Sequence, residues 1–111
     1  MNLFGKFYIN LQNNHKFKLE DGVKIKMMVK HPMHTGNQYN NQGQIIDKNI
    51  IQKIIFQLDS IEIFSASLGT GVSKDPFFEL KIFPSESSTL KITCKDEFNN
   101  YSEKKIELIK T

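Results

Sequence analysis

The chain contains a single cysteine, Cys94, so no disulfide can form within it. No run approaches the roughly 20 apolar residues that a membrane-spanning helix needs. Residues 1–11 lack both the basic start and the apolar stretch of a secretory signal peptide. From these absences alone we expect a soluble, cytoplasmic protein that has no membrane partner.

Clusters of basic residues are also absent, although the net charge is +3 and the pI is about 9.0. The lysines are spread along the chain and alternate with apolar residues, as Lys24, Lys26 and Lys30 do. This spacing is typical of the solvent face of a half-buried strand, and lysines on an exposed strand discourage pairing between copies. A nucleic-acid partner would require a basic cluster within a recognisable motif, so we predict none.

What the sequence does contain is alternation of apolar and polar residues with a period of two, the pattern of strands with one buried face. Residues 23–29 show it most clearly, with valine, isoleucine and methionine at the odd positions. Turn residues separate such segments, as in Leu58-Asp59-Ser60-Ile61, which predicts a tight hairpin. The 111 residues fit one domain, 1–111, with an all-β fold. We predict an immunoglobulin-like β-sandwich of about seven strands, at 5–11, 23–31, 50–58, 61–68, 77–83, 89–96 and 101–109.

The isoleucine-rich segment that leads into residues 50–58 is ambiguous, because its apolar residues also fit a helical stripe. Isoleucine is β-branched and disfavours helix, so we favour a strand. Two polar stretches, 31–44 and 69–75, are expected to be long loops, and loops of this length are often functional.

No constellation of residues predicts catalysis, a bound cofactor or a metal site. His31 and His34 lie in a predicted loop with no acidic residue nearby before Asp47, and His15 is distant, which is too few ligands for a metal. We interpret the two loop histidines as hydrogen-bonding or solvent-facing. Cys94 shares the apolar face of its strand and is expected to be buried and unreactive.

Lys30-His31-Pro32 together with a lone cysteine is similar to superoxide reductase, another immunoglobulin-like domain. Its site requires four histidines and one cysteine around iron. This chain has only three histidines, so we do not favour an iron enzyme.

A second resemblance is carried by an ordered set of short motifs. The chain resembles the SoxZ family over about residues 20–109. The matching residues are His31-Pro32-Met33 with Thr35-Gly36, Phe64-Ser65-Ala66-Ser67-Leu68, Asp75-Pro76-Phe77, Asp96, Tyr101 and Lys104-Lys105-Ile106. The resemblance implies an immunoglobulin-like sandwich that forms a heterodimer with a SoxY-like subunit, which carries sulfur intermediates of thiosulfate oxidation on a cysteine near its glycine-rich C-terminus.

Residues 106–111 contain neither glycine nor cysteine, so the chain resembles the non-carrier, non-catalytic partner. The family also implies export to the periplasm with the signal-bearing partner and indirect contact with the other sulfur-oxidation enzymes. We further expect that the chain alone forms a weak homodimer through the surface that binds the partner. We expect His31, Pro32, Met33, Thr35 and Gly36 to form a loop that faces the partner. The alternatives left open are a superoxide-reductase-like iron enzyme and an unrelated immunoglobulin-like protein-binding domain.

Overall fold

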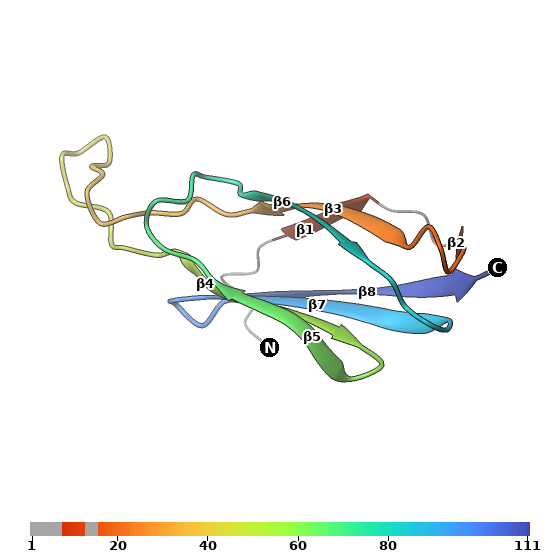
Figure 1. Cartoon of the computed structure of the whole chain (residues 1–111). Coiled ribbons are helices and arrows are strands. Elements are labelled where there is room, and N and C mark those ends of the chain that lie inside the picture. The colour runs from red at the N-terminus through yellow and green to blue at the C-terminus, as the bar shows by residue number, and fades with distance from the viewer. Residues whose placement is uncertain (1–7, 13–15) are drawn as a thin grey trace.

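A computed structural model describes residues 8–12 and 16–111, which form two β-sheets packed face to face and contain no helix (Figure 1). The smaller sheet has the strand order β1-β3-β6, and the larger one has the order β2-β8-β7-β4-β5. The strands are β1 (Tyr8–Gln12), β2 (Lys16–Phe17), β3 (Val23–Lys30), β4 (Ile51–Leu58), β5 (Ile61–Ser67), β6 (Phe77–Ile82), β7 (Ser88–Asp96) and β8 (Tyr101–Lys110). Within the described residues no helix is long and apolar enough to cross a membrane.

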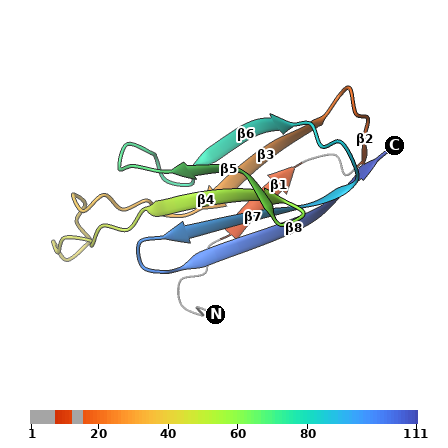
Figure 2. The ribbon, with the colours of Figure 1, turned by 60° about the horizontal axis from the view of Figure 1, so that its bottom comes forward.

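The predicted all-β sandwich is confirmed. The ambiguous isoleucine-rich segment is a strand, β4, and it lies between β7 and β5 in the larger sheet (Figure 2). The first predicted strand is found at Tyr8–Gln12, and residues 5–7 lie outside the described residues. The two-residue strand β2, which pairs in parallel with the end of β8, was not predicted.

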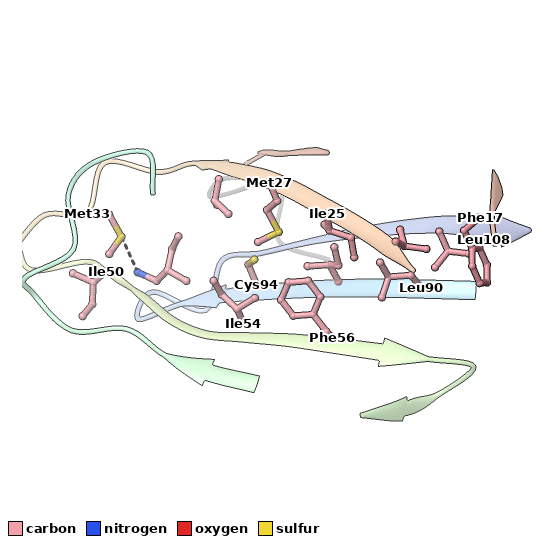
Figure 3. Packing of buried hydrophobic residues seen from close by; sticks show 14 residues of the cluster. Phe17, Ile25, Met27, Met33, Ile50, Ile54, Phe56, Leu90, Cys94 and Leu108 are labelled. Atoms are coloured by element: carbon pink, nitrogen blue, oxygen red, sulfur yellow. Dashed lines mark hydrogen bonds between the residues drawn. The ribbon is translucent and has the colours of Figure 1, made fainter. Parts of the chain in front are cut away.

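The core lies between the sheets and follows from the alternation along each strand. In β3 the residues Val23, Ile25, Met27 and Val29 are buried, and they pack against the inward residues of the larger sheet (Figure 3). Cys94 is fully buried among these side chains, as predicted. Each such large apolar side chain contributes roughly 1.5–3 kcal/mol through burial.

The position of the lysines on β3 corrects one expectation. Lys24, Lys26 and Lys30 do point to solvent, but β3 is the central strand of the smaller sheet. They therefore cannot protect a free strand edge, because β1 and β6 occupy both sides of β3. The edges of the two sheets are formed by other strands.

The β4–β5 hairpin turns through two residues, as its sequence predicts. Asp59 and Ser60 have φ values of 47° and 72°, the left-handed values that a two-residue hairpin turn requires. The Asp59 side chain accepts a hydrogen bond from the backbone N–H of Thr89 at 2.9 Å, which fixes the turn against β7. At the opposite end of the sandwich lie the long loop between β3 and β4, the β5–β6 connection and the β7–β8 turn (Figure 1).

Candidate functional site

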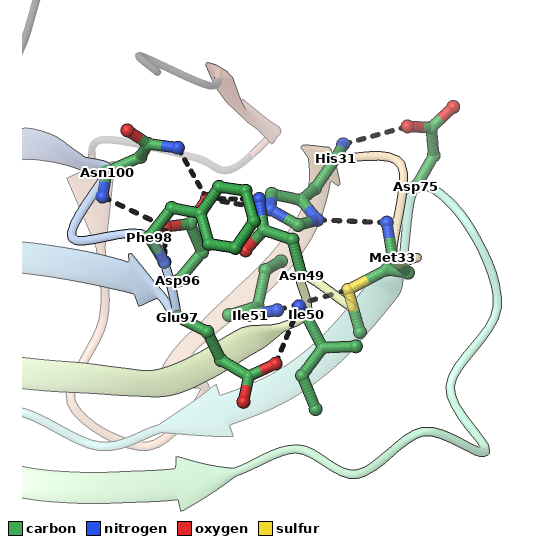
Figure 4. A network of polar contacts seen from close by, with 10 residues as sticks. All are labelled: His31, Met33, Asn49, Ile50, Ile51, Asp75, Asp96, Glu97, Phe98 and Asn100. Carbon is green, nitrogen blue, oxygen red and sulfur yellow. Dashed lines mark hydrogen bonds and ion pairs between the residues drawn. The ribbon is translucent and has the colours of Figure 1, made fainter. Parts of the chain in front are cut away.

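A buried polar network occupies the end of the sandwich where these three connections meet (Figure 4). Its centre is Asp96, the last residue of β7, which is 1% exposed. One carboxylate oxygen, Oδ1, accepts hydrogen bonds from the backbone N–H groups of Phe98 and Asn100, both at 2.9 Å. The other, Oδ2, accepts from His31 Nε2 at 3.0 Å, Asn49 Nδ2 at 3.2 Å and Asn100 Nδ2 at 2.9 Å.

The ionisation of Asp96 is determined by two opposing effects. Burial raises the pKa of the carboxyl group, while the hydrogen bonds from His31, Asn100 and Asn49 lower it. The hydrogen bonds prevail together, so the pKa of Asp96 lies below its ordinary value. The network therefore holds a buried carboxylate in its charged form.

The His31 ring joins this carboxylate to the following loop. Its Nδ1 accepts a hydrogen bond from the backbone N–H of Met33 at 3.0 Å, so in the neutral ring the proton resides on Nε2 and is donated to Asp96. The N–H and C=O of His31 both bond to Asp75, through its Oδ1 and its N–H, each at 2.9 Å. His31 thus connects all three of the loop segments.

Met33 completes this end of the core. Its backbone has a φ of 51°, which is unfavourable for a methionine, and its sulfur accepts a hydrogen bond from the N–H of Ile51 at 3.3 Å. The strained backbone is maintained because the side chain is 2% exposed and packs in the core cluster.

The structure divides the five residues that were expected to face a partner. The side chains of His31 and Met33 are both 2% exposed, so they stabilise the loop from inside and cannot contact another protein. Pro32 is exposed, and Thr35 and Gly36 are partly exposed. His31 is hydrogen-bonded, in agreement with one of the two interpretations given for the loop histidines, and its acidic neighbours Asp96 and Asp75 come from distant parts of the chain.

The donor groups do not fit an iron site of the kind that superoxide reductase would need. Both ring nitrogens of His31 are engaged in the network, and burial raises the pKa of the Cys94 thiol to about 12. His15 lies outside the described residues. Among residues 8–12 and 16–111, no three His, Cys, Asp or Glu side chains converge in a way that could hold a metal ion.

A different surface, along one long side of the sandwich, was not predicted. Here β5 is the edge of the larger sheet and β6 the edge of the smaller one, and between them lies an open cleft of about 350 Å³. Glu79 is the only charged residue among those lining it, which are Ile54, Phe56, Phe64, Ala66, Phe77, Phe78, Glu79 and Leu80. A neighbouring hollow of about 420 Å³ continues it along Ile63, Phe64 and Phe83. We call these two hollows together the open edge.

The β4–β5 pairing accounts for the apolar character of β5. The register shifts beside Phe56, so that Phe64 lies opposite Phe56 while Glu62 lies opposite Gln57. Ile63 is therefore an extra residue, a β-bulge, and two consecutive apolar side chains line the open edge. Phe64 contacts the Phe56 ring edge-to-face, with the ring centroids 5.7 Å apart, but Phe64 remains 50% exposed.

The open edge could not be located from the sequence, because it depends on which strands end each sheet. One signal was present: Phe77 and Phe83 occupy the polar positions of the alternating pattern of β6, and they are 61% and 60% exposed. Large exposed apolar patches mark surfaces that bind other molecules.

Comparison with known families decides which kind of protein this is. The model of the sulphur oxidation protein SoxZ matches residues 11–107. The chain belongs to the SoxZ family. The matched range includes the His31-Pro32-Met33 motif, Asp75 and Asp96, which the hydrogen bonds of His31 connect in this chain. No curated protein matches the sequence.

Solved structures show the same fold in another class of protein. Two variants of superoxide reductase (neelaredoxin) from Ignicoccus hospitalis have TM-scores of 0.68, with 11% and 12% identity. The alignments cover 96% and 97% of this chain and 82% and 83% of theirs. A further structure of that protein gives a TM-score of 0.63 at 13% identity and covers 93% of this chain and 80% of its own. At such low identity the likeness concerns the fold alone.

Proposed function

We propose that this chain is the non-catalytic partner subunit of a SoxYZ-type sulfur carrier, and that the open edge is the surface that binds the carrier subunit. Membership of the SoxZ family supports a role in sulfur oxidation beside a SoxY-like partner. The observation that carries the choice of surface is the exposure of large apolar side chains beside the cleft, where Phe64 and Phe77 are 50% and 61% exposed.

The area of the open edge suits a stable complex. Ile63, Phe64, Phe77 and Phe83 are 40–61% exposed and line the two hollows. Since a large side chain offers about 200 Å², they expose roughly 400 Å² of mostly apolar surface. A stable interface takes about 800 Å² from each partner, so these four side chains would supply half of it. The occupant would be an apolar face of the SoxY-like subunit.

Co-expression with the SoxY-like subunit and size-exclusion chromatography test the proposal. The unaltered chain should coelute with the carrier as a 1:1 complex at micromolar concentration. Phe64→Asp should abolish coelution, because it would bury a charge in an apolar interface. Phe98→Asp is the matched control, since Phe98 is 52% exposed but lies at the loop end, and it should leave the complex intact.

A further variant distinguishes binding at the open edge from binding at the loop of residues 31–36, which the sequence analysis expected to face the partner. Pro32→Arg alters the exposed part of that loop without touching the buried network. Loss of the complex with Pro32→Arg and its retention with Phe64→Asp would move the interface to the loop. Two separate peaks for the unaltered pair would overturn the proposed function itself.

The same proposal places the mature complex in the periplasm, with this chain exported together with the carrier subunit. Cell fractionation should find the chain outside the cytoplasm only when the carrier is expressed with its signal. Export of the chain alone would contradict this part of the proposal.

A further inference from the structure

Strand β6 has a free edge whose backbone groups can be identified individually. Among the strands of residues 8–12 and 16–111, only β3 pairs with β6. The N–H of Val29 donates to the C=O of Pro76 at 2.9 Å, and hydrogen-bonded pairs alternate along an antiparallel ladder. In the printed register, the N–H and C=O groups of Phe78 and Leu80 therefore face β3. Those of Phe77, Glu79 and Lys81 face the free edge.

The side chains along this strand have a two-fold pattern. From Phe77 to Phe83 the sequence is Phe-Phe-Glu-Leu-Lys-Ile-Phe, with Leu80 at its centre. Glu79 and Lys81 flank the centre with opposite charges, and an exposed phenylalanine stands at each end. When such a strand pairs with a second copy of itself in antiparallel orientation about Leu80, Glu79 of each copy lies opposite Lys81 of the other.

This register agrees with the backbone as well as with the charges. It places Glu79 opposite Lys81, and both residues direct their N–H and C=O groups to the free edge, so the pair can exchange two hydrogen bonds. In this register the side chains that point away from the larger sheet lie opposite side chains of the other copy that also point away from it. A register centred on Glu79 or on Lys81 would place like charges opposite each other, which is destabilising.

We propose that the chain forms a homodimer in which β6 of one copy pairs with β6 of a second copy, antiparallel and centred on Leu80. The two small sheets then form one six-stranded sheet. Because the two-fold axis is perpendicular to that sheet, both larger sheets lie on the same side of it, and the two open edges face each other. Phe64 and Leu80 of both copies then line one shared apolar space.

Contacts within each subunit are compatible with this arrangement. Glu79 forms an ion pair with Lys24 at 2.9 Å on the same outer face, and a carboxylate can accept further donors. Lys81 lies over the Phe83 ring with its Nζ 5.4 Å from the centroid, close to the strand. In the dimer Phe83 lies opposite Phe77 of the other copy, so the most exposed rings of the open edge cover each other.

The inference does not rest on the proposed function, although the two have a joint consequence. A carrier subunit that binds the open edge would use the surface that the second copy covers. The homodimer is then the form of the free subunit, and the carrier displaces one copy to form the heterodimer.

Sedimentation equilibrium of the purified chain tests the dimer and its register. The unaltered chain should dimerise at concentrations below about 1 mM, and E79K or K81E alone should raise the Kd about tenfold, because each places two like-charge pairs across the axis. The double variant E79K/K81E restores unlike pairs and should return the Kd to within about threefold of the original. Glu62→Lys, a matched charge change on β5, should have no effect.

Disulfide trapping provides a test that does not depend on charge. Leu80→Cys should give a covalent dimer on oxidation, because residues opposite each other at a non-hydrogen-bonded position have Cα atoms about 4.5 Å apart. Glu79→Cys should not, because the two introduced thiols would be diagonal and too far apart. Monomer at all concentrations, failure of the double variant to recover, or equal trapping of both cysteines would overturn the proposal.

Discussion

Replacing Asp96 with asparagine removes one negative charge without changing the size of the side chain. The carboxylate accepts hydrogen bonds on both oxygens, from two backbone N–H groups at Oδ1 and from three side chains at Oδ2. An amide has one acceptor end and one donor end. In either orientation its NH₂ group therefore faces groups that also donate.

The loss of stability follows from the number of donors affected. If the amide NH₂ takes the place of Oδ2, the donors on His31, Asn49 and Asn100 lose their acceptor. A buried donor without a partner costs roughly 1–3 kcal/mol. Asn100 is only partly buried and can reach water, which leaves the buried donors of His31 and Asn49. We therefore expect Asp96→Asn to lower the free energy of unfolding by about 2–6 kcal/mol at pH 7.

The pH dependence supplies a second, independent expectation. The pKa of Asp96 is lower in the folded chain than in the unfolded chain, so the unfolded state binds more protons as the pH falls through the ordinary aspartate range near 4. The stability contributed by the carboxylate is present above that range and is lost as the pH falls through the folded pKa. Asp96→Asn should lack this part of the acid-induced loss.

Urea unfolding monitored by circular dichroism, between about pH 7 and pH 3, measures both effects. Glu97→Gln is the matched control, because Glu97 is the adjacent carboxylate and accepts from the N–H of Ile50 and from Lys48 at a more exposed position. It should cost less than about 1 kcal/mol. The reasoning would be refuted by an Asp96→Asn variant within about 1 kcal/mol of the unaltered chain that also keeps its full acid sensitivity.

Four further outcomes concern Cys94, Gly22 and the metal content of the protein. Because burial raises the pKa of Cys94 to about 12, its thiol should react slowly with a thiol reagent in native buffer and rapidly in denaturant; equal rates would place it at the surface. Cys94→Ser should cost roughly 1–3 kcal/mol, measured by urea unfolding, by burying a hydroxyl among apolar side chains. Gly22→Ala should cost at least about 2 kcal/mol, because Gly22 has a φ of +70° and an added Cβ would lie 2.7 Å from both Ile82 O and the Phe83 ring; an unchanged Tm would refute this. Elemental analysis of protein purified without a histidine tag should find less than about one-tenth equivalent of iron or zinc, and near one equivalent of iron would favour the superoxide-reductase alternative.

Local patterns predicted most of the strands correctly, because each depends on residues close together in the chain. The alternation from Val23 to Val29, the burial of Cys94 and the turn at Asp59 and Ser60 are of this kind. The strand assignment of β4 also followed from local chemistry, through the β-branched isoleucines. Such features need no knowledge of which strands become neighbours.

The buried network and the open edge depend on long-range arrangement. His31 and Asp96 are 65 residues apart, and nothing in the local sequence indicates that they form a hydrogen bond. The family motifs include both residues, but the motifs do not show why the residues are there. The structure shows that their hydrogen bonds connect the three loops at this end of the sandwich. The error about Lys24 has the same origin, since the place of β3 in the sheet is set by its pairing with β1 and β6.

The alternating backbone of β6 also makes this strand a reporter in amide hydrogen exchange. In the monomeric chain the odd-numbered amides from Phe77 to Lys81 should exchange rapidly with deuterated solvent, while the even-numbered amides bonded to β3 exchange slowly. Any strand that adds to this edge slows the odd-numbered amides. A molecule that only fills the apolar cleft leaves the exchange of the odd-numbered amides rapid. A comparison of the exchange rates of odd- and even-numbered amides over these six residues thus distinguishes backbone pairing from side-chain docking. It does so whichever protein covers this side of the sandwich.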